Sequence, residues 1–134
     1  MLKVARDNKN LYFYAETTDD ITGNSGNDWM TLYLNTDRKF DTGWHGYDYR
    51  VVEGRLLQQY TDDRWKTIHL ISPIVEGKKL MYGFPASVVG LNTKDINMEF
   101  KWSDNMHNDN DPMDWYLNGD TAPGGRFNFI YATK

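Results

Sequence analysis

Aromatic rings beside short polar side chains are the feature of this sequence that could do chemistry. Trp44 and Tyr47 lie in a glycine-rich stretch, and Trp102 is closely followed by Asp104 and Asn105. A ring offers an apolar face for stacking, a carboxylate accepts hydrogen bonds, and an amide both donates and accepts them. The five residues are therefore predicted to bind a sugar-like ligand. The alternatives are rings packed over the rim of the fold, and Asp and Asn forming local turns.

Hard oxygen ligands are dense in a second stretch, between residues 108 and 114. Asp109, Asp111 and Asp114 alternate there with asparagine and proline. Calcium takes roughly six to eight oxygen ligands, so these carboxylates are a candidate structural calcium site. The glycine and the closing glutamate of an EF-hand loop are missing, which excludes that motif. Asp37 and Asp41 form another candidate pair.

Catalytic motifs are weakly represented in this chain. It has no cysteine, which excludes disulfides, thiol nucleophiles and cysteine-based zinc sites, although it does not argue against export. The histidines His45, His69 and His107 are not spaced as zinc ligands. Carboxylates are abundant, but nothing singles out a pair for acid–base work. We therefore predict a protein that is not an enzyme.

Charge and residue composition indicate which classes of binding partner to expect. The formal charge is −4 and the basic residues are scattered, so no basic face for nucleic acid is expected. Aromatic residues make up 15% of the chain, with 5 Trp and 9 Tyr, more amphipathic rings than a core needs. The sequence also has no apolar run long enough to cross a bilayer. Nucleic acid binding and membrane insertion are therefore not expected.

Period-two alternation of apolar and polar residues dominates the sequence and predicts strands. Glu53-Gly54 predicts a two-residue hairpin turn, and residues 85–91 could form one helical turn that ends at Gly90. Residues 103–125 are rich in Asp, Asn, Gly and Pro and are expected to be a long loop. The pattern indicates one all-β domain over residues 1–134, an antiparallel β-sandwich of jelly-roll or immunoglobulin-like type. The expected strands cover residues 11–17, 29–35, 47–52, 55–61, 67–75, 79–85, 95–104 and 126–133.

Several segments together resemble the DOMON-like sandwiches, and within them the family 9 carbohydrate-binding modules. The resemblance is carried, in order along the chain, by residues 7–15, 28–37, 43–50, 82–91 and 100–105. Two departures stand out: Gly83-Phe84 replaces the acidic residue expected before Pro85, and the strands expected ahead of Leu11 are reduced to about ten residues. The shortened start suggests a fragment of a longer chain.

The resemblance implies a function as well as a fold. It implies noncatalytic binding of a poly- or oligosaccharide, with calcium as an occasional structural ion, in an extracellular or periplasmic protein that degrades glycans. Some DOMON-like domains bind haem instead, for which Met30, Met81, Met98 and His69 are the residues to consider. Another reading is a structural sandwich that docks onto a catalytic domain of the same parent chain through its exposed rings.

Overall fold

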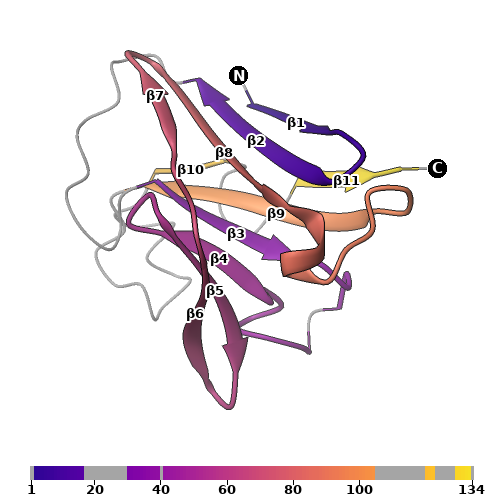
Figure 1. Ribbon diagram of the computed structural model, residues 1–134. Helices are drawn as coiled ribbons and strands as arrows, with labels where there is room; N and C mark the ends of the chain where they lie inside the picture. Colours follow the sequence, from indigo (N-terminus) through magenta and orange to yellow (C-terminus); the bar gives the residue numbers. More distant parts are fainter. Residues whose placement is uncertain (1, 17–29, 40, 105–119, 123–128, 134) are drawn as a thin grey trace.

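Two antiparallel sheets face each other in the computed structural model, which describes residues 2–16, 30–39, 41–104, 120–122 and 129–133 (Figure 1). The smaller sheet has the strand order β1-β2-β8-β7. The larger sheet has the order β10-β9-β3-β4-β5-β6, and β11 also pairs with β9. The predicted antiparallel β-sandwich is confirmed. The strands are β1 (Leu2–Arg6), β2 (Asn10–Glu16), β3 (Thr31–Asn35), β4 (Tyr49–Val52), β5 (Leu56–Thr61), β6 (Arg64–Leu70), β7 (Ile74–Glu76), β8 (Lys79–Pro85), β9 (Asn97–Asp104), β10 (Asp120–Ala122) and β11 (Phe129–Ala132).

Alternating apolar residues build the core between the two sheets. In β2, Leu11 and Phe13 are fully buried, whereas Tyr12 and Tyr14 point to the other face. The Phe13 ring meets the ring of Phe100 in the opposite sheet edge-on, with centroids 5.6 Å apart. Each such side chain contributes about 1.5–3 kcal/mol when it leaves water. Four alternating residues at and just before β9 are also buried: Ile96, Met98, Phe100 and Trp102.

Two hairpins in the larger sheet close through residues with positive φ. Glu53 and Gly54, at φ 56° and 70°, connect β4 to β5, as the sequence predicts. Asp62 and Asp63, at φ 54° and 60°, connect β5 to β6. Two consecutive positive φ values define the turn whose twist matches that of paired strands. Aspartate tolerates this conformation because its short side chain can hydrogen-bond locally.

Three sequence expectations are wrong in detail. The strand expected over residues 67–75 is two strands: the chain leaves the larger sheet after β6 and enters the smaller sheet at β7, with Pro73 between them. The stretch expected to be a loop contains β10, which pairs with the end of β9. Met81 lies on the outer face of β8, beside the groove described below, and not in the core with Met30 and Met98.

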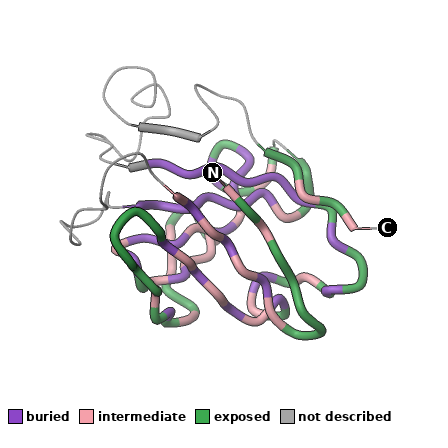
Figure 2. Tube along the Cα trace, turned by 90° about the horizontal axis from the view of Figure 1, so that it is seen from above, coloured by how far each residue is buried: buried purple, intermediate pink, exposed green. Residues whose placement is uncertain are grey.

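A 3₁₀ helix, η1 (Ala86–Val89), follows β8 and ends at Gly90 with φ 72°, which confirms the predicted helical turn. Within the described ranges, no helix is long and apolar enough to cross a membrane. Buried residues alternate with more exposed ones along several strands (Figure 2), but all five residues of β3 are buried. Other side chains therefore cover the outer face of β3 as well as its inner face. On the outer face these include Trp44 and Tyr47, which pack against Tyr33.

Candidate functional site on the outer face of the larger sheet

An aromatic cluster covers the outer face of the larger sheet. Tyr33 projects from the centre of β3 and is buried beneath Trp44 and Tyr47, with ring centroids 5.5 Å and 5.2 Å away. Tyr60 and Trp65, which are directly opposite each other on β5 and β6, pack against this group and remain partly exposed. The Trp65 centroid lies 6.2 Å from that of Trp44 and 5.1 Å from that of Tyr60. We call these five residues the outer aromatic cluster.

A tight turn places Trp44 and Tyr47 on the sheet. Their backbones exchange hydrogen bonds of 2.8 Å and 2.9 Å across His45 and Gly46, both of which have positive φ. Gly43, at φ 69°, is packed so closely that an added Cβ would lie 2.1 Å from the Tyr47 carbonyl oxygen. The glycines of this stretch do not expose the two rings to a ligand. They fold the turn, and Trp44 and Tyr47 are only 9% and 4% exposed.

A row of polar side chains runs beside the partly exposed members of the cluster. Arg50 holds its guanidinium carbon 4.4 Å from the centroid of the Trp65 ring, a cation–π contact. Its Nε donates to Gln58 Oε1 at 2.8 Å, and Gln58 Nε2 is 3.2 Å from Thr67 Oγ1. The register explains this row, because Arg50 pairs with Gln58 and Gln58 with Thr67 across β4, β5 and β6. Neighbouring strands thus bring guanidinium, amide and hydroxyl groups to one ring.

The structure does not bring Trp102 to this surface. Trp102 is 4% exposed and lies between the sheets, where its ring centroid is 5.3 Å from that of Tyr82 in the smaller sheet. It therefore faces the opposite side of the larger sheet from Trp44, and the two rings cannot form the single platform that the sequence suggested. Asp104 is the last residue of β9 and pairs with Asp120. Asn105 lies outside the described residues.

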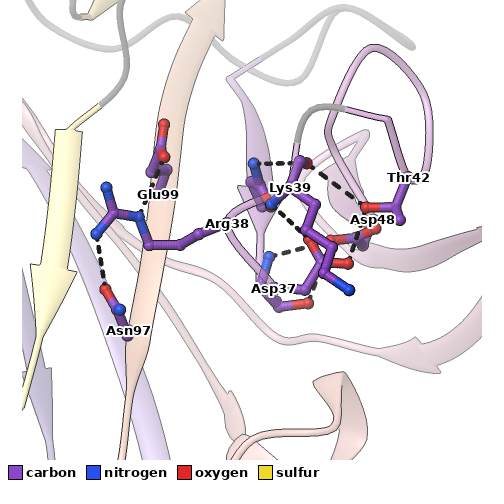
Figure 3. Close-up of polar contacts among 9 residues, drawn as sticks. Asp37, Arg38, Lys39, Thr42, Asp48, Asn97 and Glu99 are labelled. Atoms are coloured by element: carbon purple, nitrogen blue, oxygen red, sulfur yellow. Dashed lines mark hydrogen bonds and ion pairs between the residues drawn. The ribbon is translucent and has the colours of Figure 1, made fainter.

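A carboxylate pair lies in the loop between β3 and β4 (Figure 3). Thr42 donates to Asp37 at 2.8 Å, the Lys39 amide donates to Asp37 at 2.9 Å, and the Thr36 amide donates to Asp48 at 3.1 Å. The charge of Asp37 is close enough to raise the pKa of Asp48, so these two carboxylates are neighbours. The pairing of Asp37 with Asp41 stays a prediction. Both carboxylates thus accept hydrogen bonds from other residues of the loop, and these bonds hold the loop in its conformation. In the ranges the structure describes, no group of three or more Asp, Glu, His or Cys residues could hold a metal ion. The predicted calcium ligands Asp109, Asp111 and Asp114 lie outside those ranges.

The Asp48 carboxylate is expected to cost stability at neutral pH. Burial, and then the nearby charge of Asp37, raise its pKa above the usual value. A raised folded-state pKa means that the stabilising contribution is present below the unfolded pKa and is lost as pH rises through the folded one. Asp48→Asn should therefore raise the melting temperature at pH 7 in chelator, and this gain should shrink toward zero near pH 4. Melting curves at both pH values test this; a variant less stable than the wild type at pH 7 contradicts it.

Polar residues are also buried on the outer face of β3 and β9. Lys101 is fully buried beside Tyr33, its partner in the strand register, and burial lowers its pKa to about 8. Nearby, Arg38 donates to Glu99 at 3.2 Å and to Asn97 at 3.0 Å, across the end of β9 (Figure 3). Burial disfavours the charged form of an ammonium, and this is why the pKa of Lys101 falls.

Comparison of the chain with protein-family models, with curated proteins and with solved structures finds no match. The sequence analysis named Trp44 and Tyr47, and the structure does bring these two rings together. It missed Tyr33, Arg50, Gln58 and Tyr60. Their only signal was the alternation of each strand, in which they occupy the positions that point away from the core.

Proposed function

We propose that the chain is a noncatalytic carbohydrate-binding module, with the outer face of the larger sheet as its sugar-binding surface. One observation carries the proposal: Trp65 and Tyr60 are partly exposed beside a connected row of Arg50, Gln58 and Thr67. A pyranose ring is apolar on its faces and polar at its rim. It therefore needs both a ring to stack on and donors and acceptors at the edge of that ring.

The two kinds of residue in the cluster have different roles in this proposal. Trp65 and Tyr60 contact the sugar, and Gln58 and Thr67 bond its hydroxyl groups. Trp44 and Tyr47 are too buried to stack on a ligand. They support the Trp65 ring from below and hold it in place, which reduces the conformational entropy lost on binding. Asp104 and Asn105 stay predictions as additional sugar contacts.

The first experiment is a glycan array probed with the purified chain, once with calcium and once with chelator. Reproducible binding to one class of glycan is expected. Loss of binding in chelator would support calcium at Asp109, Asp111 and Asp114, whereas binding in both conditions would assign the affinity to the rings alone. Silence in both conditions would contradict the proposal. The proposal includes an extracellular or periplasmic parent protein that acts on glycans.

A second function, docking onto another domain of the same parent chain, is favoured by a different observation. Four apolar side chains on β6 and β7 are well exposed. Exposed apolar residues that gather along an edge are typical of interaction surfaces. Under this alternative, glycan binding is absent and substitution of Leu70 weakens the contact with the neighbouring domain. The four are Ile68 at 40%, Leu70 at 67%, Ile74 at 54% and Val75 at 43%.

A further inference from the structure

A second ring lies on the outer face of the other sheet. Tyr12 of β2 alternates with fully buried Leu11 and Phe13, so it points away from the core. Its ring occupies the space over Gly83 of β8, where an added Cβ would lie 2.9 Å from Tyr12 Cδ1. Glycine at position 83 therefore lets the Tyr12 ring rest against the sheet. Any larger residue there would push the ring away.

Hydrogen bonds fix this ring from its far end. The Tyr12 hydroxyl lies 2.8 Å from Asp7 Oδ2. Asp7 in turn accepts from the backbone amides of Lys9 and Asn10 at 2.8 Å and 2.7 Å, and these bonds lower its pKa to about 2. Asp7 is therefore ionised, and available as an acceptor, at any physiological pH. A tyrosine held at both ends has little conformational entropy left to lose when a ligand stacks on it.

A groove of about 300 Å³ opens beside the Tyr12 ring. This volume is at the lower end of the ~300–1,000 Å³ that small-molecule sites occupy. The lining combines an amide and a hydroxyl with apolar side chains, and none of the described residues that line it carries a charge. Such a lining suits a neutral ligand with both apolar and hydroxyl surface, and not an anion. Besides Tyr12, the lining side chains include Asn10, Ser72, Ile74, Met81 and Pro85.

We infer that this groove is a second saccharide site, for a single neutral sugar ring. The inference rests on the proposed function for its ligand class but not for its location. β2 and β8 belong to the smaller sheet, which lies opposite the larger one (Figure 1). The outer aromatic cluster lies on the outer face of the larger sheet. The two sites face away from each other across the core. One module would therefore hold two glycan chains, or two branches of one glycan, at the same time.

The test is a backbone-amide NMR titration with neutral hexasaccharides of xylose, glucose, mannose and galactose. In the wild type, signals of Gly83 and of Trp65 are both expected to shift, with two saccharides bound per chain. Tyr12→Ala should weaken only the Gly83 response, by about tenfold, which corresponds to roughly 1.4 kcal/mol. Tyr12→Phe keeps the ring but loses the bond to Asp7, so it should weaken that response less than Tyr12→Ala does. Tyr14→Ala is the matched control, because Tyr14 lies on the same face of β2 outside the groove.

Light scattering with the corresponding soluble polysaccharides tests the bivalency directly. The wild type should cross-link the polymer into a turbid suspension, and Tyr12→Ala and Trp65→Ala should each leave it clear. The inference is overturned if Gly83 does not shift while Trp65 does, or if Trp65→Ala alone abolishes every shift. Shifts at neither site overturn the inference and the proposed function together.

Discussion

Gly43→Ala is expected to destabilise the fold by about 3 kcal/mol, far more than a surface substitution usually does. Gly43 has φ 69°, and a Cβ there would lie 2.1 Å from the Tyr47 carbonyl oxygen and 2.6 Å from its carbonyl carbon. Backbone atoms cannot give way as the end of a side chain can, so the turn must open. For a chain of this length, the melting temperature should fall by about 10 °C.

The same substitution should also weaken glycan binding, although Gly43 touches no ligand in the proposed site. Opening the turn displaces Trp44 and Tyr47, and the Trp65 ring then loses the partner 6.2 Å away that holds it in place. We expect at least a tenfold loss of affinity at a temperature where the variant is still folded, about 1.4 kcal/mol. Calorimetric titration below the melting transition measures this.

Gly90→Ala is the matched control for this prediction. Gly90 has nearly the same φ, 72°, but an added Cβ would meet only the Tyr49 hydroxyl, at 3.6 Å. Gly90→Ala should therefore lower the free energy of unfolding by only about 1 kcal/mol, the cost of holding alanine in the left-handed conformation. The difference between the two variants isolates the clash with Tyr47. Equal losses at both positions would contradict the packing that we describe.

The second large effect is a rise in stability with increasing alkaline pH. Burial lowers the pKa of Lys101 from 10.5 to about 8, so the folded chain releases a proton that the unfolded chain still holds between those values. Stability increases with pH wherever the unfolded state binds more protons. The free energy of unfolding should therefore rise by about 2 kcal/mol between pH ~8 and pH ~10, at roughly 1.4 kcal/mol per pKa unit. Urea unfolding across this range measures the slope.

The Lys101→Met variant shows whether this lysine is the source of the slope. Methionine keeps the length of the side chain but cannot titrate, so the rise in unfolding free energy should be absent from this variant. Tyr12, Tyr14 and Tyr49 have raised pKa values in the folded chain, so they can only lower the unfolding free energy as the pH approaches ~10. Burial and the charge of Asp48 raise the pKa of Tyr49, which leaves the tyrosine protonated in this window. If the unfolding free energy of Lys101→Met still rises between pH ~8 and pH ~10, the assignment of the rise to Lys101 is wrong.

Alternation along the strands was enough to predict the sandwich and its core. Leu32 and Leu34 on β3, and Met98 and Phe100 on β9, point inward as their spacing requires. Glu53-Gly54 was predicted as a turn because few residue pairs adopt two positive φ values. The division of residues 67–75 between two sheets was not predictable in this way. A proline interruption in a strand pattern does not reveal which sheet the chain enters next.

The candidate site was harder to predict because it depends on register between strands. Trp65 acquires Tyr60 and Arg50 as neighbours only through the pairings of β4 with β5 and of β5 with β6. Alternation assigns each of these residues to a face but not to a partner. Trp102 shows the converse problem. Trp102 lies two residues before Asp104, at the end of a strand. This local sequence does not reveal whether the ring faces the core or a ligand.

Calorimetric titration of Trp65→Ala against the glycan class that the array identifies tests the central claim most directly. Leu70→Ala is the comparison, since Leu70 lies on the same strand, is 67% exposed and is not part of the outer aromatic cluster. With binding at the Tyr12 groove followed separately, Trp65→Ala should weaken the remaining affinity by about tenfold or more, and Leu70→Ala should leave it unchanged. If Trp65→Ala binds the glycan as tightly as the wild type does at both sites, there is no sugar site on the outer face of the larger sheet.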